Sequence, residues 1–289
     1  MFCIGATKAG TTWLHRHLSQ HPECHLRSIK ELHYFSKSEP QHFDKALREG
    51  AQAMELVQAR MDASGQTNPS QAQQMADLCD WQDVLGKREI NLPAYRQYME
   101  SGIESRHVVG DVTPGYALMP MPKLKALLAV GSDVRIVYLI RDPLERLWSH
   151  VRMIAKRTAL QSFANEAAHL LDRVTSGDLS GEAKGIVARG NYAAILPKLA
   201  RVFDPRRLLV LFYEDLMTSQ GVAKLSAFLG IACEGADFAR RVHVGLPLDM
   251  SAAARHQALA FLRPQYDYVA AAFQNIPAVW RANMNEGLA

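Results

Sequence analysis

The chain has 289 residues, of which 48% are hydrophobic and 21% charged, a composition typical of a globular protein with a sizeable core. The formal net charge of +4 is small and the basic residues are scattered, which argues against a nucleic-acid-binding protein. The four cysteines lie far apart without metal-ligand spacing, so we expect no disulfide framework, no zinc site and a reducing, cytoplasmic location.

Five short runs of apolar and β-branched residues predict strands, at 1–4, 23–26, 107–110, 134–140 and 208–213. The run 134–140 is nearly continuous and is bounded by Gly131 and Pro143, as expected of a buried parallel strand. Helical patterns alternate with these runs, beginning with residues 11–21. The alternation predicts an α/β fold, in which a parallel central sheet of about five strands has helices on both faces.

The segments between the strands are mostly helical in pattern. Residues 172–185 mix glycines and serines with charges and are predicted to form a loop. About the last forty residues are helical and apolar on one side, which favours packing onto the rest of the chain. No internal repeat is visible, so we expect one domain over 1–289 with helical insertions around 36–106 and 151–187. No apolar stretch reaches the roughly 20 residues that span a bilayer, so we expect no stable membrane insertion.

A glycine-containing loop, residues 5–12, joins the first predicted strand to the first predicted helix. Such a loop presents backbone N–H groups and the positive end of a helix dipole to an anion. Lys8 adds a positive charge, and Thr11 and Thr12 add hydroxyl donors. The loop is not a Walker A motif, because its lysine precedes Gly10 by two residues. The residues alone fit an anion-binding loop and a plain glycine turn with an exposed lysine equally well.

A second polar segment follows the strand predicted at 134–140. Asp142 can cap the next helix, with Pro143 in its first position. Arg141 would then lie at the edge of the sheet, and Ser149 about two turns into the helix. Taken alone, these two residues could equally be a surface arginine and an ordinary helix serine.

Residues near the ends of several predicted strands should come together in space. In a parallel sheet the carboxyl ends of the strands share one edge, where ligands bind. Lys8, Glu31, Arg141 and Tyr213 each follow a predicted strand within a few residues. We therefore expect them to surround a single cleft, although they are spread over most of the chain.

These segments resemble the motifs of PAPS-dependent sulfotransferases, which use 3′-phosphoadenosine-5′-phosphosulfate as donor. The loop is similar to their 5′-phosphosulfate-binding loop at Gly5, Lys8, Gly10, Thr11, Thr12 and Leu14. The spacing from Arg141 to Ser149 matches their 3′-phosphate site. The resemblance implies a fold like that of P-loop NTPases, with PAPS as donor, PAP as product and no metal.

Further segments extend the resemblance, especially to the carbohydrate-type and bacterial members. Residues 30–35 resemble a K-E-x-H-[FY]-F segment, and 213–216 resemble an F-E-D-L segment. Residues 189–192 resemble a glycine-tyrosine loop that closes over the cofactor. Residues 111–116 resemble an E-K-[ST]-P-x-Y segment, but Val112 replaces a lysine that lies near the substrate in several carbohydrate members. That lysine's role is not carried over, and the difference puts a glycan acceptor in doubt.

The resemblance assigns roles to individual residues. Glu31 stands in the position of the general base, Lys8 would stabilise charge on the leaving phosphate, and His33 is the rival base because an imidazole titrates near neutral pH. Glu31 would need partial burial to keep its pKa accessible, and a purely structural Lys30–Glu31 pair is the alternative. The expected cofactor-binding residues are Lys8, Ala9, Gly10, Thr11, Thr12, Arg141, Ser149, Arg189, Gly190 and Tyr192.

Two other functions are compatible with the same fold class. A P-loop-type kinase would need a strand-end aspartate free to hold Mg²⁺, and the nearest, Asp142, precedes proline as an expected cap. A catalytically silent PAP-binding protein is the other alternative, although Lys8, Glu31, Arg141 and Ser149 are all present. The sequence leaves the acceptor open among a small molecule, a lipid and a glycan.

Overall fold

Four parallel strands form the central sheet, in the order β4-β1-β5-β6. The computed structural model describes residues 1–64, 68–160, 162–239 and 245–287. The strands are β1 (Phe2–Cys3), β4 (Asp111–Val112), β5 (Ile136–Ile140) and β6 (Leu208–Phe212). All five residues of β5 are buried, as its continuous apolar pattern predicts. This arrangement confirms the predicted parallel α/β fold.

The strand count differs from the prediction of about five in a single sheet. Two of the predicted runs contain β2 (Cys24–His25) and β3 (Val108–Val109), which pair in parallel with each other as a separate two-stranded sheet. The strand that borders β1 is instead β4, which follows β3 after Gly110 alone. β4 begins with the charged residue Asp111 and follows β3 after a single glycine, so it forms no apolar run of its own in the sequence.

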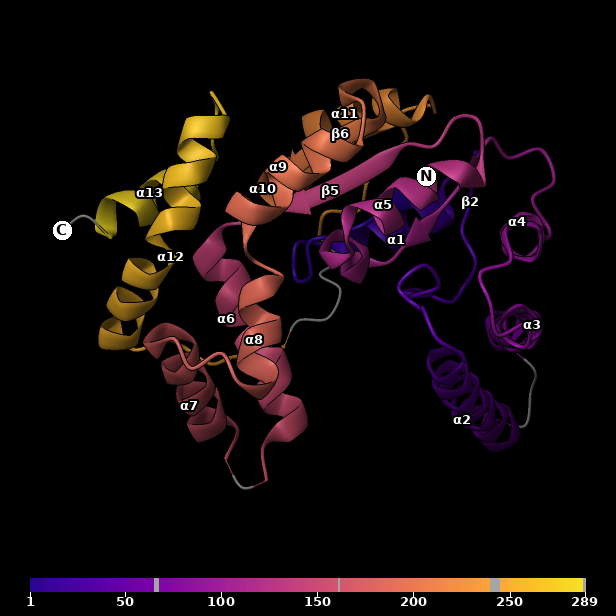
Figure 1. The fold of residues 1–289 in the computed structure, drawn as a ribbon, viewed down its shortest axis with the longest axis horizontal. Coiled ribbons are helices and arrows are strands. Elements are labelled where there is room, and N and C mark those ends of the chain that lie inside the picture. The colour runs from indigo at the N-terminus through magenta and orange to yellow at the C-terminus, as the bar shows by residue number, and fades with distance from the viewer. Residues whose placement is uncertain (65–67, 161, 240–244, 288–289) are drawn as a thin grey trace.

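Helices flank the sheet and take up most of the chain. The first half contains α1 (Thr11–Gln20), α2 (Pro40–Ser64), α3 (Pro69–Leu85), α4 (Leu92–Glu100), a 3₁₀ turn η1 (Pro114–Leu118) and α5 (Met121–Ala126). In Figure 1, α2, α3 and α4 lie together at the right, away from the later helices. Among the residues that the structure describes, no helix is long and apolar enough to cross a membrane.

The second half adds α6 (Pro143–Thr158), α7 (Phe163–Ser176), α8 (Gly181–Ala188), α9 (Tyr192–Val202), α10 (Tyr213–Leu216) and α11 (Ser219–Leu229). The loop predicted over 172–185 is therefore wrong for most of its length, because α7 and α8 leave only 177–180 between them. Buried Leu171 and Val174 of α7, and Ala183 and Ile186 of α8, supply packing that outweighs the weak helix propensity of the local glycines and serines.

Two C-terminal helices, α12 (Ala252–Ala272) and α13 (Ala278–Glu286), complete the chain. As predicted for a helical segment with one apolar side, α12 packs against α6, α7 and α9. Figure 1 shows this pair on the side of the molecule opposite to α2–α4. The C-terminal helices therefore pack against the helices that follow β5 in the chain.

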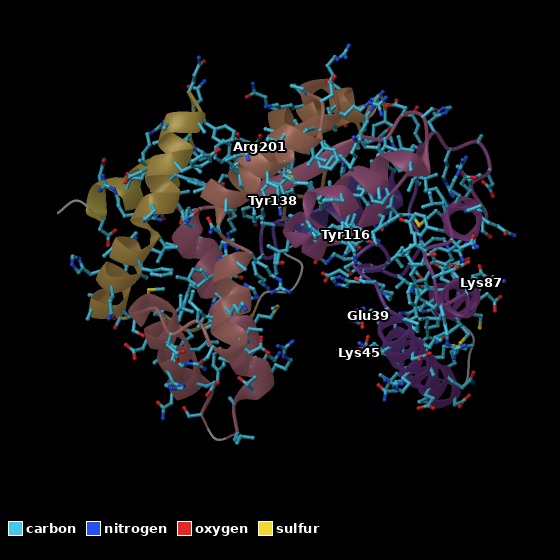
Figure 2. The ribbon with its side chains drawn as sticks, viewed as in Figure 1. Glu39, Lys45, Lys87, Tyr116, Tyr138 and Arg201 are labelled. Atoms are coloured by element: carbon cyan, nitrogen blue, oxygen red, sulfur yellow. The ribbon has the colours of Figure 1, made fainter. Side chains whose placement is uncertain are left out.

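Buried aromatic side chains mark the centre of the molecule. Tyr116 and Tyr138 have no exposed surface and lie near the middle of the view in Figure 2, whereas Glu39, Lys45 and Lys87 lie toward one edge of the molecule. Tyr138 is on β5, and Tyr116 is on η1, just after β4. Both tyrosines thus lie close to the carboxyl ends of the strands that carry the candidate site.

Candidate active site

The loop between β1 and α1 has the geometry of an anion-binding turn. Lys8 and Gly10 adopt left-handed backbone conformations, with φ of 70° and 87°. A Cβ atom on Gly10 would lie 2.6 Å from the Tyr213 ring, so the loop requires glycine there. Gly10 is also the N-cap residue of α1 and, as a glycine, makes no side-chain capping hydrogen bond to the first turn. The first N–H groups of α1 are therefore open to an anionic ligand.

The other predicted loop residues differ in their accessibility. The Ala9 amide donates to the Ala6 carbonyl at 3.1 Å, and the Ala9 side chain is fully buried. Thr11 is buried and Thr12 is half-buried. Ala9 thus supports the shape of the loop, whereas Thr12 is the more accessible of the two hydroxyl donors.

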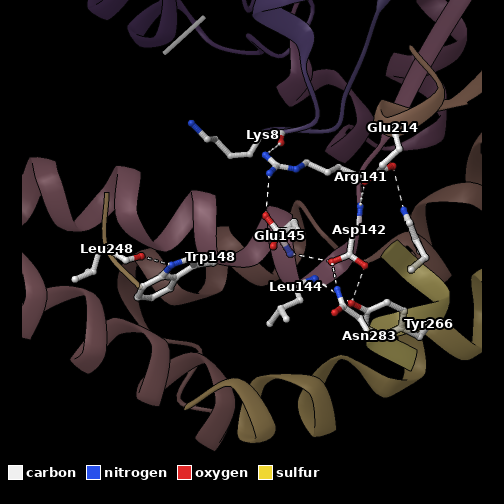
Figure 3. A network of polar contacts seen from close by, with 11 residues as sticks. Lys8, Arg141, Asp142, Leu144, Glu145, Trp148, Glu214, Leu248, Tyr266 and Asn283 are labelled. Atoms are coloured by element: carbon white, nitrogen blue, oxygen red, sulfur yellow. Dashed lines mark hydrogen bonds and ion pairs between the residues drawn. The ribbon is translucent and has the colours of Figure 1, made fainter. Parts of the chain in front are cut away.

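Arg141 lies beside this loop, as expected from its position after β5. Its Nη1 donates to the Lys8 carbonyl at 3.3 Å, and its guanidinium lies 5.0 Å from the centre of the Tyr213 ring. Its Nη2 forms an ion pair with Glu145 at 3.1 Å (Figure 3). The structure therefore brings together residues from the ends of β1, β5 and β6. The sequence analysis missed Glu145, although its position four residues after Arg141 on a helix was a usable signal.

The site carries an excess of positive charge. Partial burial lowers the pKa of Lys8, and the charges of Arg141, Arg152 and Lys30 lower it further. Burial lowers the pKa of His150 to about 2, assisted by the neighbouring cations Arg146, Arg189, Lys8 and Arg157. A surplus of cations that depress each other's pKa favours the binding of an anion.

Asp142 caps α6, as predicted. Its side chain has no exposed surface, and its Oδ1 accepts a hydrogen bond from the Glu145 amide at 3.0 Å. A buried carboxylate engaged in this way is not free to hold Mg²⁺, which removes the feature that a P-loop kinase would need. In the part of the chain that the structure describes, no group of three or more His, Cys, Asp or Glu residues could hold a metal ion.

The remaining residues expected at the cofactor differ in their placement. Ser149 is half-buried on α6, and Arg189 is half-buried at the C-terminal end of α8. Gly190 packs against the buried Arg146 guanidinium, and a Cβ there would lie 2.1 Å from its Nη2. Tyr192 is fully buried, and its hydroxyl accepts from the Arg141 amide at 3.1 Å and donates to the Arg141 carbonyl at 2.8 Å. Tyr192 therefore fixes the Arg141 backbone.

Glu31 and His33 lie on a tight loop next to β4. Both residues adopt left-handed backbone conformations, with φ angles of 62° and 50°, and not an extended one. The two side chains nevertheless face each other, with Glu31 Oε2 3.6 Å from His33 Nε2. Lys30 Nζ donates to the other oxygen, Oε1, of Glu31. The loop is tied to the sheet by the Glu31 amide, which donates to the Val112 carbonyl at 3.1 Å.

The pairing of Glu31 changes its acidity in a way that the sequence analysis did not anticipate. The partial burial expected for Glu31 is not found, because 45% of its side-chain surface is exposed; the burial that remains raises its pKa, but the contact with His33 and the charge of Lys30 outweigh it. Together they hold the pKa at about 2. Glu31 is therefore ionised at neutral pH.

Two further side chains, Tyr116 and Lys37, hold this loop in place by hydrogen bonds to its backbone. The Tyr34 amide donates to the Tyr116 hydroxyl at 2.9 Å. Lys37, only 7% exposed, donates from Nζ to the His33 carbonyl at 2.9 Å. Nothing in the local sequence marks Lys37, whereas Tyr116 is the tyrosine of the motif matched over residues 111–116, although the motif did not reveal this contact.

Comparison with known proteins places this geometry in context. The model of a family described as the sulfotransferase family matches residues 1–235. A sulfotransferase from Alicyclobacillus acidocaldarius is similar in structure, with 21% identity over 97% of both chains and a TM-score of 0.63. The sulfotransferase domain from the curacin biosynthetic pathway is 21% identical, with 82% of this chain and 78% of that chain covered and a TM-score of 0.50. At this identity the two structures show a shared fold. No protein with a curated description matches.

Proposed function

The chain belongs to the sulfotransferase family, and we propose that it transfers the sulfuryl group of PAPS to a hydroxyl or amine of a small-molecule, lipid or glycan acceptor. The observation that carries the proposal is the meeting of the Lys8 loop with Arg141, joined by the 3.3 Å hydrogen bond to the Lys8 carbonyl. Cations on two adjoining segments suit a donor with two separate anionic groups, as PAPS has.

The residues at this edge of the sheet fit such a donor. PAPS supplies an activated sulfuryl group, joined to a phosphate in a mixed anhydride. Lys8 and the first-turn N–H groups of α1 would bind the 5′ end, and Arg141 and Ser149 would bind the 3′-phosphate, as the motif resemblance implies. The lowered pKa of Lys8 supports this assignment, because a bound anion would relieve the repulsion among the neighbouring cations.

Positioning and charge stabilisation would provide most of the catalysis. Lys8 and the loop amides would stabilise the charge that grows on the leaving phosphate as the sulfur–oxygen bond breaks. Glu31 would accept the proton that the acceptor loses, a contribution of roughly 10²–10⁴-fold in rate. These groups come from the ends of different strands, so the sheet sets their relative positions.

The low pKa of Glu31 constrains how the proton would move. A carboxylate with a pKa of about 2 is a weak base toward a free alcohol. Proton transfer would therefore accompany attack on sulfur, when the forming bond makes the acceptor's proton much more acidic. His33 is the alternative proton acceptor, since its Nε2 lies 3.6 Å from Glu31 Oε2 and therefore beside the same position of the acceptor.

Transfer of label from sulfur-labelled PAPS tests the proposal. The panel of acceptors would contain a phenol, a long-chain alcohol and an oligosaccharide. We expect label on at least one of these classes, with stoichiometric release of PAP. Phosphate transfer from ATP to the panel without sulfuryl transfer would contradict the proposal and favour a kinase. Tight binding of PAP without transfer to any acceptor would favour a silent PAP-binding protein.

A further inference from the structure

The C-terminal helices reach the residue next to Arg141. Tyr266 of α12 donates from its hydroxyl to Asp142 Oδ2 at 2.9 Å, and Asn283 of α13 donates from Nδ2 to Oδ1 at 3.0 Å (Figure 3). Both side chains are buried, with 1% and 4% of their surface exposed. Both also lie beyond residues 1–235, the part of the chain that the family model matches.

The same helices hold the other side of the Arg141–Pro143 turn. The Asp142 amide donates to Glu214 Oε1 at 3.0 Å, and the second oxygen of Glu214 accepts from the Trp280 indole N–H of α13 at 3.1 Å. The Leu144 amide donates to the Tyr266 hydroxyl at 3.3 Å. The turn that carries Arg141 is therefore anchored to α12 and α13 through its backbone and through the Asp142 carboxylate.

The Asp142 carboxylate depends on these donors. Burial raises the pKa of Asp142 to about 6, while hydrogen bonds from the Glu145 amide, Asn283 and Tyr266 act to lower it. A buried carboxylate that loses a donor becomes costly to keep ionised. Without Tyr266 or Asn283 the carboxylate would be less well held, and the start of α6, which it caps, would loosen.

We propose that Tyr266 and Asn283 are positioning residues for the 3′-phosphate site. By holding Asp142 they fix Arg141 against the Lys8 loop and fix the first turn of α6, the helix that carries Ser149. They thereby set the preference of the site for a nucleotide that bears a 3′-phosphate. The inference rests on the proposed function, because it assumes that Arg141 binds this phosphate.

The test compares the binding of PAP and 5′-AMP, which differ only in the 3′-phosphate. Tyr266→Phe removes one hydroxyl and keeps the ring against Trp280, and Asn283→Leu removes the amide donor at similar volume. In each variant we expect the Kd for PAP to rise about tenfold and the Kd for 5′-AMP to change by less than about twofold, because the lost donor holds the turn that carries Arg141 and not the rest of the nucleotide site. The ratio of the two affinities, measured by calorimetry, should fall accordingly.

A matched control separates positioning from stability. Val269→Ala removes packing from α12 at a fully buried position whose side chain has no hydrogen-bonding group to offer Asp142, so it should lower Tm without changing the affinity ratio. In an Arg141→Ala background, Tyr266→Phe should weaken PAP much less than it does in the wild type, since the part of its effect that passes through Arg141 is then absent.

The inference is overturned if Tyr266→Phe and Asn283→Leu lower Tm as Val269→Ala does but leave the affinity ratio unchanged. It is also overturned if Tyr266→Phe weakens PAP equally with and without Arg141. If the wild-type protein bound PAP no more tightly than 5′-AMP, the proposed function itself would be wrong.

Discussion

Replacing Glu31 by glutamine is expected to lower kcat for sulfuryl transfer by about 10²–10⁴-fold, the usual worth of a general base. Glutamine keeps the size and one oxygen of the side chain but cannot take up a proton. The expected donor-binding groups, Lys8 and Arg141, are unchanged in this variant, so the Kd for PAP should stay within about threefold. Single-turnover transfer from labelled PAPS, run beside PAP calorimetry, measures both quantities.

An exposed carboxylate nearby provides the control for this variant. Glu39 directly precedes α2. Among the contacts that the structure describes, its side chain accepts a hydrogen bond only from Gln41, which is also exposed. Glu39→Gln should therefore leave kcat within about twofold. If Glu31→Gln turned over at the wild-type rate with unchanged PAP affinity, Glu31 would not be the base, and the Lys30–Glu31 pair would be structural.

The pH dependence of kcat/KM distinguishes Glu31 from His33. Because the pKa of Glu31 is lowered to about 2, its carboxylate is ionised throughout the range from pH 5 to pH 8. A glutamate base therefore predicts no loss of activity from this group as pH falls to 5. A base that behaved as an ordinary imidazole would instead lose activity as pH falls below neutrality.

The lowered pKa of Glu31 also affects stability. The pairing of Glu31 stabilises the fold above about pH 4.5, and this stabilisation is lost as pH falls toward 2.

Replacing Arg141 by alanine is expected to raise the Kd for PAP by about 10- to 100-fold and to change the Kd for 5′-AMP by less than about threefold. Hydrogen bonds to charged groups are worth about 1.5–3 kcal/mol, and each 1.4 kcal/mol is a tenfold change in affinity. Loss of the ion pair with Glu145 should cost little, because both partners are partly exposed. Arg141→Lys should be intermediate, since lysine keeps the charge but not the planar, forked donor geometry.

The matched control for this variant is Arg201→Ala, which removes an exposed arginine on α9 and should change neither Kd. An equal loss of affinity for PAP and for 5′-AMP in Arg141→Ala would mean that Arg141 supports the nucleotide site as a whole. The assignment of the 3′-phosphate to Arg141 would then be wrong.

The parts of the site that follow strands were predictable from the sequence. The Gly5–Gly10 loop is flanked by an apolar run and a helical pattern, and the Asp142–Pro143 pair specifies the start of α6. Because parallel strands end at one edge, the position of Lys8 after β1 and of Arg141 after β5 was enough to place them side by side.

The parts that depend on contacts between distant segments were not predictable in the same way. The left-handed conformations of Glu31 and His33 depend on hydrogen bonds to Val112 and Tyr116, which lie some eighty residues further along the chain. β4 was hidden because it begins with the charged residue Asp111 and is separated from β3 by Gly110 alone. The contacts of Tyr266 and Asn283 with Asp142 span 124 and 141 residues and leave no local pattern.

The direction of the Glu31 pKa shift was likewise not predictable from the sequence. The adjacent Lys30 was visible in the sequence, but the approach of His33 to Glu31 arises from the folded loop. Burial alone would have raised the pKa of Glu31, and the opposite result follows only when Lys30 and His33 are both placed around it. The direction of such a shift therefore requires the tertiary structure.

Thermal unfolding in the presence of PAP, compared with 5′-AMP, ADP and ATP with Mg²⁺, tests the central claim most directly. A ligand that binds only the native state adds about 2.7 kcal/mol at 100 times its Kd, enough to raise Tm by several degrees. We expect the largest rise with PAP, and we expect Arg141→Ala to reduce it to about the size of the rise with 5′-AMP. A rise with ATP and Mg²⁺ but none with PAP would contradict the account, because the site would then hold a nucleoside triphosphate and not a 3′-phosphorylated nucleotide.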